Sequence, residues 1–192
     1  MIKGDVFVDL TYILSQVFII FNYVFLAITY GLKSRKSILS FNILSIVTTA
    51  TSYGLLSAWS GCVMCFVSLT RNIIFLLQEG KEKSEKITVS DWTILSVLYL
   101  ISIIFAILTY DGLFSLLSVF AVMLYTLSVW QKNAKVYKIL GVPINVLWIG
   151  YNIFVKSIFG VICETILLVF VIYELIVYCK TKGVINKKEQ IS

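Results

Sequence analysis

Residues 37–78 read SILSFNILSIVTTATSYGLLSAWSGCVMCFVSLTRNIIFLLQ, an apolar stretch in which Arg71 is the only charged residue. As a single helix, a segment of about 40 residues would be about 60 Å long, twice the thickness of the hydrocarbon core of a bilayer. The cluster Ala58-Trp59-Ser60-Gly61 interrupts the stretch near its centre. The sequence therefore predicts a hairpin of two membrane-spanning helices.

The composition of the whole chain also indicates a lipid environment. Of the 192 residues, 59% are hydrophobic and 14% are charged, and the mean hydropathy is +0.96. A typical soluble domain is about 45–50% apolar and about 25% charged. Seven helices of about 20 residues would use nearly the whole chain and leave no room for a soluble catalytic domain. The net charge of +6 is carried by residues between apolar runs, so we expect no nucleic-acid partner.

Seven apolar runs are predicted to span the membrane. Their approximate ranges are 7–30, 37–57, 60–78, 91–110, 112–130, 137–155 and 157–178. If these helices alternate in direction, thirteen of the sixteen basic residues fall on one side, and only Lys3 and Lys156 fall on the other. The positive-inside rule makes the more basic side cytoplasmic. The N-terminus is therefore expected outside, and residues 179–192 are expected to form a cytoplasmic tail.

An internal repeat relates the two halves of the chain. A shift of 99 positions places Lys33 on Lys132, Lys36 on Lys135 and Gly61 on Gly160, and residues 51–54 match 150–153 if one residue is slipped. We expect one all-α membrane domain, 1–192, with two parallel three-helix repeats at 7–78 and 112–178 joined by a linker helix at 91–110. Repeats of this kind occur in transporters whose solute binds near the midplane.

Six residues inside the predicted helices are candidates for contact with a solute: Asn22, Arg71, Asn145, Trp148, Asn152 and Glu164. A charge at the membrane centre costs about 2.5–3.5 kcal/mol on insertion scales, so Arg71 and Glu164 should face the bundle interior or water. Asn145, Trp148 and Asn152 share one helix face at i, i+3 and i+7. These residues either line a polar path or bond helix to helix, with the two charges as a structural ion pair.

The residues that enzymes use are largely missing. The chain has no histidine, no paired carboxylates on one helix, no phosphate-binding glycine loop and no serine nucleophile motif, so we expect no catalytic site, metal site or cofactor. Cys62 and Cys65 have C-x-x-C spacing, but their apolar neighbours favour helix packing over redox chemistry. Pro143, the only proline, is either a static kink or a hinge.

One pattern resembles a known family. Trp148-x-x-x-Asn152-x-x-x-x-Ser157-x-x-Gly160-x-x-x-Glu164, with Gly61 and Arg71 in the equivalent hairpin, looks like the YgjV family of bacterial inner-membrane proteins over roughly residues 10–178. That resemblance implies the location but no mechanism.

The three-one-three layout is similar to that of the SWEET sugar facilitators and the PnuC vitamin transporters. Those proteins carry a small solute between two three-helix bundles, and related proteins form trimers, so the resemblance implies a homo-oligomer as one candidate assembly. This chain lacks the Pro-Gln dipeptide of the PQ-loop pattern, and its predicted helices 1, 2 and 5 lack the usual proline hinge.

Two functions follow as hypotheses. The first is a small-solute transporter or facilitator, whose partners are the lipid bilayer and an unidentified small solute, with Glu164 as a candidate carrier of a coupling proton. The second is a non-transporting accessory or assembly protein, which predicts a dry interior and a contact between Arg71 and Glu164.

Overall fold

The fold was analysed in a computed structural model, which describes residues 2–32, 35–78, 89–130 and 134–189. These ranges contain seven α-helices and no strand, which confirms the all-α prediction. The helices are α1 (Ile2–Gly31), α2 (Arg35–Leu55), α3 (Trp59–Gln78), α4 (Val89–Leu108), α5 (Ser115–Trp130), α6 (Ala134–Phe154) and α7 (Ile158–Glu189).

Several helix bounds differ from the predicted ones. Helix α5 begins at Ser115 instead of 112 because Gly112 adopts a φ of +82°, which glycine tolerates, and the Asp111 amide donates to the Ser115 hydroxyl at 3.2 Å. Helix α1 begins earlier, at Ile2, and α7 continues to Glu189 through most of the predicted tail. Five basic residues used to predict the orientation lie outside the described ranges: Lys33, Lys81, Lys83, Lys86 and Lys132.

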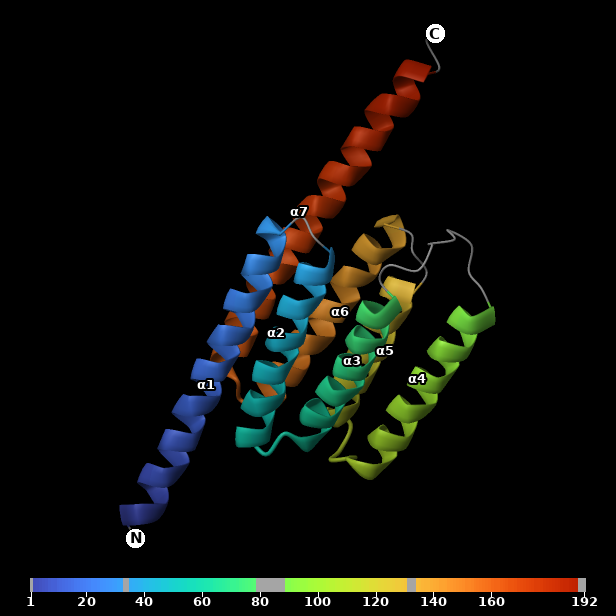
Figure 1. Cartoon of the computed structure of the whole chain (residues 1–192). Coiled ribbons are helices and arrows are strands. Elements are labelled where there is room, and N and C mark those ends of the chain that lie inside the picture. Colours follow the sequence, from blue (N-terminus) through green and yellow to red (C-terminus); the bar gives the residue numbers. More distant parts are fainter. Residues whose placement is uncertain (1, 33–34, 79–88, 131–133, 190–192) are drawn as a thin grey trace.

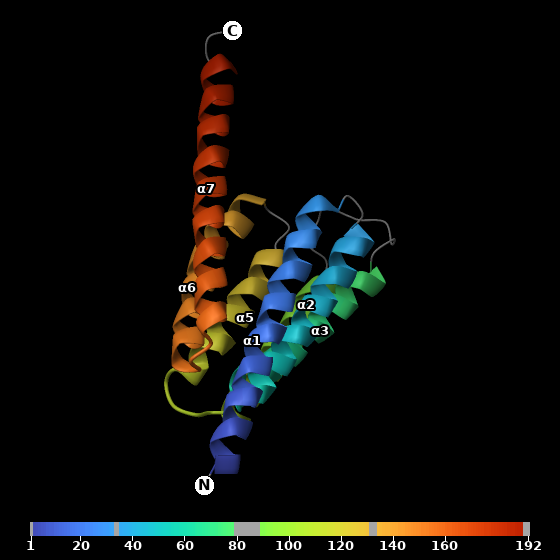
Figure 2. The ribbon, with the colours of Figure 1, turned by 90° about the vertical axis from the view of Figure 1, so that its left-hand side faces the viewer.

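Six of the helices form a closed ring. Contacts join α1 to α2, α2 to α3, α3 to α5, α5 to α6, α6 to α7, and α7 back to α1. Helix α4 packs on the outside of this ring, against α3 and α5, and lies at the edge of the molecule in Figure 1. Figure 2 shows α6 and α7 on one side and α2 and α3 on the other. Helices α2 and α6 therefore face each other across the ring, and none of their described Cα atoms approach within 8 Å.

Three of the described helices are long and apolar enough to cross a membrane. The apolar segments are Leu10–Thr29 in α1, Trp59–Leu77 in α3 and Ile158–Val177 in α7, and shorter apolar segments occur in α4, α5 and α6. Helix α2 is richer in hydroxyl residues. Three of its threonines, Thr48, Thr49 and Thr51, donate to backbone carbonyls one turn earlier, a pairing that satisfies hydroxyls without water.

The two turns that close the hairpins α2–α3 and α6–α7 have the same backbone geometry. In the first turn, the Ala58 amide donates to the Tyr53 carbonyl at 2.9 Å, and Ser57 has a φ of 56°. In the second, the Ser157 amide donates to the Asn152 carbonyl at 2.9 Å, and Lys156 has a φ of 58°. Both helices thus end in a Schellman motif.

The matching bonds lie 99 residues apart, without the one-residue slip that the sequence comparison suggested. The counterpart of Tyr53 is therefore Asn152.

Candidate functional site

The first hairpin turn receives the side chain of Tyr151 from α6. Tyr151 is 0% exposed, and its hydroxyl accepts a hydrogen bond from the Gly61 amide at 2.7 Å. The same hydroxyl lies 3.0 Å from the Ser60 hydroxyl and donates to the Ala58 carbonyl at 3.3 Å. A Cβ atom at position 61 would lie 2.5 Å from the Tyr151 hydroxyl oxygen. Glycine is therefore required at position 61 for the ring to approach, and every polar group of this contact has a partner.

The second hairpin turn receives Asn152, also from α6. A Cβ atom at Gly160 would lie 2.5 Å from Asn152 Oδ1 and 2.7 Å from the Ser157 hydroxyl oxygen. Asn152 is 1% exposed, and its Oδ1 accepts a hydrogen bond from the Tyr53 hydroxyl at 3.0 Å. Within the described residues, Asn152 Nδ2 and the Ser157 hydroxyl have no hydrogen-bond partner at this turn, and the Ser52 hydroxyl, on α2 near the first turn, has none either. This turn therefore holds hydrogen-bonding capacity that the protein itself does not use.

Three aromatic rings meet at the centre of the six-helix ring, and we call Tyr53, Trp148 and Tyr151 the aromatic cluster. Tyr53 stacks on Trp148 with centroids 6.0 Å apart and an interplanar angle of 12°. Tyr151 meets Tyr53 edge-on at 5.3 Å and Trp148 at 5.9 Å. Such offset and edge-to-face pairs stabilise by about 0.5–1.5 kcal/mol beyond area burial. The cluster bridges α2 and α6 where their backbones do not touch.

Glu164 lies one helical turn after Gly160 and contacts α1. Its Oε1 accepts a hydrogen bond from the Tyr23 hydroxyl at 2.9 Å, and that hydroxyl lies 3.4 Å from the Gly160 carbonyl oxygen. Nearer the turn, the Gln16 side-chain oxygen accepts from the Phe159 amide at 3.1 Å. The start of α7 is thus joined to α1 by several polar contacts, and one of them binds the carboxylate.

Arg71 contacts a different helix. It is 3% exposed, its Nη1 donates to the Thr126 hydroxyl on α5 at 3.2 Å, and its guanidinium carbon lies 4.4 Å from the centroid of the Tyr125 ring. A cation over an aromatic face in this way is attracted by the ring quadrupole. The α3–α5 contact therefore holds the positive charge of Arg71, whereas the α7–α1 contact holds the Glu164 carboxyl group.

The remaining two candidates bond within the helical framework. Asn22 on α1 accepts a hydrogen bond from the Ser45 hydroxyl on α2. Asn145 donates to the Gly141 carbonyl of its own helix at 2.7 Å. Of the six predicted residues, Trp148 and Asn152 both contact Tyr53 at the ring centre, and Glu164 shares the Tyr23 hydroxyl with the carbonyl of Gly160, the glycine against which Asn152 packs.

Sequence reasoning missed the tyrosines. Tyr23, Tyr53 and Tyr151 each provide a hydroxyl to the site, yet none was a candidate. The available signal was that a tyrosine hydroxyl inside an apolar span needs a hydrogen-bond partner.

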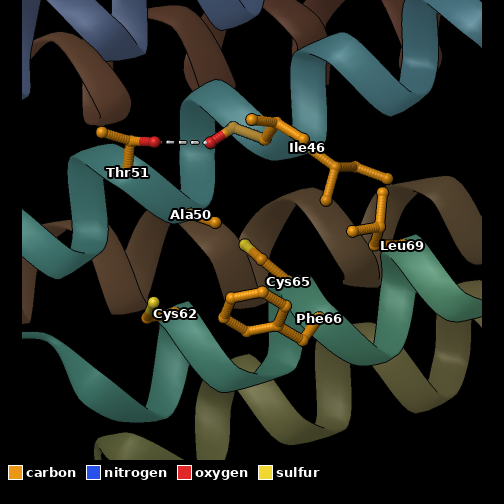
Figure 3. Close-up of a pocket in the computed structure, with 8 residues that line it drawn as sticks. Ile46, Ala50, Thr51, Cys62, Cys65, Phe66 and Leu69 are labelled. Carbon is orange, nitrogen blue, oxygen red and sulfur yellow. Dashed lines mark hydrogen bonds between the residues drawn. The ribbon is translucent and has the colours of Figure 1, made fainter.

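A groove between α2 and α3 is apolar. Its volume is about 280 Å³, and Figure 3 shows Cys62, Cys65 and Phe66 of α3 facing Ile46 and Ala50 of α2. The thiols of Cys62 and Cys65 are free and buried, as expected of packing residues. Within the described ranges, no three His, Cys, Asp or Glu side chains gather as a metal site.

The corresponding region of the second hairpin is more polar than this groove. Counted 99 residues on, Ile46 corresponds to Asn145 and Cys65 to Glu164. At these two positions the polar side chain therefore occurs in the second hairpin and not in the first.

The long apolar helices and the polar residues enclosed between them define an all-helical membrane protein. A family model for Imp-YgjV, described as a bacterial inner membrane protein, matches residues 13–182, and the chain belongs to this family. This match confirms the resemblance seen in the sequence and gives the location as the bacterial inner membrane. A search of curated proteins and a search of solved structures each found no match.

Proposed function

We propose that this chain is a small-solute transporter or facilitator, and that the solute binds at the centre of the six-helix ring. The observation that carries the proposal is the pair of unpartnered polar groups, Asn152 Nδ2 and the Ser157 hydroxyl, beside the aromatic cluster. A buried polar group without a partner costs about 1–3 kcal/mol, so a purely structural core gains nothing from keeping two of them. A solute with hydrogen-bonding groups would satisfy both.

The proposal includes a topology of seven spanning helices in two parallel repeats, with α4 as the linker and the N-terminus outside. Two observations support the repeats. The hairpin turns have the same backbone bonds at an offset of 99 residues, and the ring places α1 opposite α5, α2 opposite α6 and α3 opposite α7. Counterparts would face each other in this way around a twofold axis. Tyr53 and Asn152, which are counterparts, hydrogen-bond to each other across the ring.

The six candidate residues take two proposed roles. Trp148, Asn152 and Glu164 contact the solute, because they lie at or next to the ring centre. Asn22, Asn145 and Arg71 hold helices in position, because the contacts given for them go to the protein.

The runner-up is a non-transporting accessory or assembly protein. The protein-internal bonds of Asn22 and Asn145 favour it, because they are typical of polar residues that join helices. The contact between Arg71 and Glu164 that this function would use is replaced by separate contacts to α5 and α1.

The proposal is tested by measuring solute binding first and solute transport second. Purified protein in detergent would be screened for thermal stabilisation by sugars, amines, vitamins, nucleosides and amino acids, and hits would be tested for uptake into proteoliposomes. We expect one solute class to stabilise the wild type and to lose its effect in Asn152→Ala. Ser102→Ala is the control, because Ser102 is buried in α4 outside the ring and bonds its own helix. If no solute stabilises the wild type, the accessory function replaces the transporter.

A further inference from the structure

The ionisable side chain that lies beside the ring centre is acidic. Glu164 is the acidic residue of this region, and the hydrogen bond that the structure gives its carboxylate comes from the neutral Tyr23 hydroxyl. A carboxylate has about four acceptor positions, so a further, charged donor can bind.

Arg71 inside the helices and Lys156 at the second hairpin turn lie away from this carboxylate. Arg71 stands ten residues beyond Gly61, whereas Glu164 stands four beyond Gly160, so Arg71 lies about 9 Å deeper along the axis if the two turns are level. Its guanidinium contacts Thr126 and Tyr125 on α5. The side chain of Lys156 is exposed at the outer turn. The carboxylate is therefore the formal charge that a solute at the ring centre would meet.

The aromatic cluster also favours a positively charged solute. The faces of Trp and Tyr rings carry a negative potential that attracts cations, most strongly where water is excluded. Trp148, which stacks on Tyr53, is only half-buried. The chain already contains one such pairing, since Arg71 lies over Tyr125 at 4.4 Å.

The unpartnered amide sets a second requirement. Asn152 Nδ2 is a donor only, so the group that binds it must be an acceptor, such as a hydroxyl, ether or carbonyl oxygen. The Ser157 hydroxyl beside it can donate or accept. A ligand that matches both ends has a positive group for Glu164 and a neutral oxygen for Asn152.

We propose that the solute is a small organic cation that carries a protonated amine and a neutral oxygen, the chemistry of amino alcohols and amino sugars. The amine binds the Glu164 carboxylate beside the aromatic cluster, and the oxygen accepts from Asn152. A carboxylate on the solute would lie near Glu164 without a basic partner at the same depth, so amino acids and anions are disfavoured. This inference rests on the proposed transport function and names its substrate class.

The experiment compares solutes that differ by a single amine. Glucosamine is paired with glucose, and ethanolamine with ethylene glycol, against full-length protein in detergent, with thermal stabilisation and competition for uptake as readouts. The amine member should act at a concentration about tenfold or more below that of its neutral partner, the factor expected of a charge-assisted hydrogen bond. Glu164→Gln should abolish this preference, so that the amine and neutral members act at similar concentrations.

Two further variants keep the result interpretable. Glu174→Gln removes an exposed carboxylate from the same helix and should keep the amine preference. Tyr23→Phe removes the neutral donor to the Glu164 carboxylate, so the amine preference should rise; a preference that is lost in this variant overturns the cation proposal even if Glu164→Gln does not fold.

The possible outcomes separate the cation proposal from the transport function. Equal action of the amine and neutral members on the wild type, or a preference that survives Glu164→Gln, overturns the cation proposal while solute transport stands. If none of the probes and none of the wider panel binds, the transport function fails and the cation proposal fails with it.

Discussion

The α2–α3 and α6–α7 hairpin turns have the same backbone geometry but differ in how their polar groups are used. Each turn contains a glycine whose added Cβ would lie 2.5 Å from a side chain of α6: Tyr151 at Gly61 and Asn152 at Gly160. At the first turn the Tyr151 hydroxyl meets three protein groups, and at the second Asn152 Nδ2 and the Ser157 hydroxyl meet none among the described residues.

This difference suggests separate roles for the two turns: the first stabilises the fold, and the second serves the proposed function. The first turn, where the Tyr151 hydroxyl has all its partners, is expected to hold the halves of the molecule together. On the proposed function, the unused donors and acceptors of the second turn bind a ligand. The two turns thus act as controls for each other, and substitutions in one can be judged against the other.

The largest effect should come from Gly61→Ala. The new Cβ would overlap the Tyr151 ring, which is fully buried and cannot move without losing its three contacts. Overpacking of this kind costs about 1–3 kcal/mol, so equilibrium unfolding in mixed detergent–SDS micelles should show a loss in that range. Gly160→Ala should cost less, because the hydroxyl and amide that it meets have fewer bonds to lose. A larger loss for Gly160→Ala would reverse the assigned roles of the turns.

A smaller loss is expected for Tyr151→Phe. The change keeps the ring but leaves the Gly61 amide and the Ser60 hydroxyl without this partner. Leaving buried donors unpaired should lower the free energy of unfolding by about 1–2 kcal/mol in the same assay. Solute-induced stabilisation, measured as a shift in Tm, should be retained. A variant as stable as the wild type would show that the first turn does not lock the halves together.

Tyr53→Phe should be milder still. The Tyr53 hydroxyl makes one hydrogen bond, to Asn152 Oδ1, and interhelical bonds of this kind average about 0.6 kcal/mol in membrane proteins. Because the change frees a second atom of Asn152, we expect solute affinity to change more than stability does. Parallel unfolding and binding titrations measure both. A stability loss that equals that of Tyr151→Phe would contradict the comparison.

The smallest effect is expected for Ser157→Ala. The Ser157 hydroxyl has no partner to lose among the residues that the structure describes, and alanine already occupies the equivalent position 58 in the first turn. Stability should stay within about 0.5 kcal/mol of the wild type, whereas Ser60→Ala should be destabilising because Ser60 bonds Tyr151. If Ser157→Ala is the more damaging of the two in an unfolding titration, its hydroxyl has a structural partner after all.

Prediction from sequence succeeded where the cause was local. The break at Ala58–Gly61 predicted a hairpin, and α2 ends at Leu55 while α3 begins at Trp59. The cost of a charge in lipid predicted that Arg71 faces the interior, and it is 3% exposed. Its partner could not be predicted, because two interior charges on different helices can pair with each other or with any neighbouring helix.

The sequence by itself determined the helices, the hairpin turns and the membrane location, because apolar runs, breaks and glycines act within a few residues of the chain. Only the tertiary structure decided which polar atoms have partners. Tyr151 meets a turn 90 residues away, and Tyr53 meets Asn152 across 99 residues. Such contacts depend on which helices adjoin in the ring and at what depth. A residue's type therefore gives its hydrogen-bonding capacity, and the packing of the helices determines whether the protein itself uses that capacity.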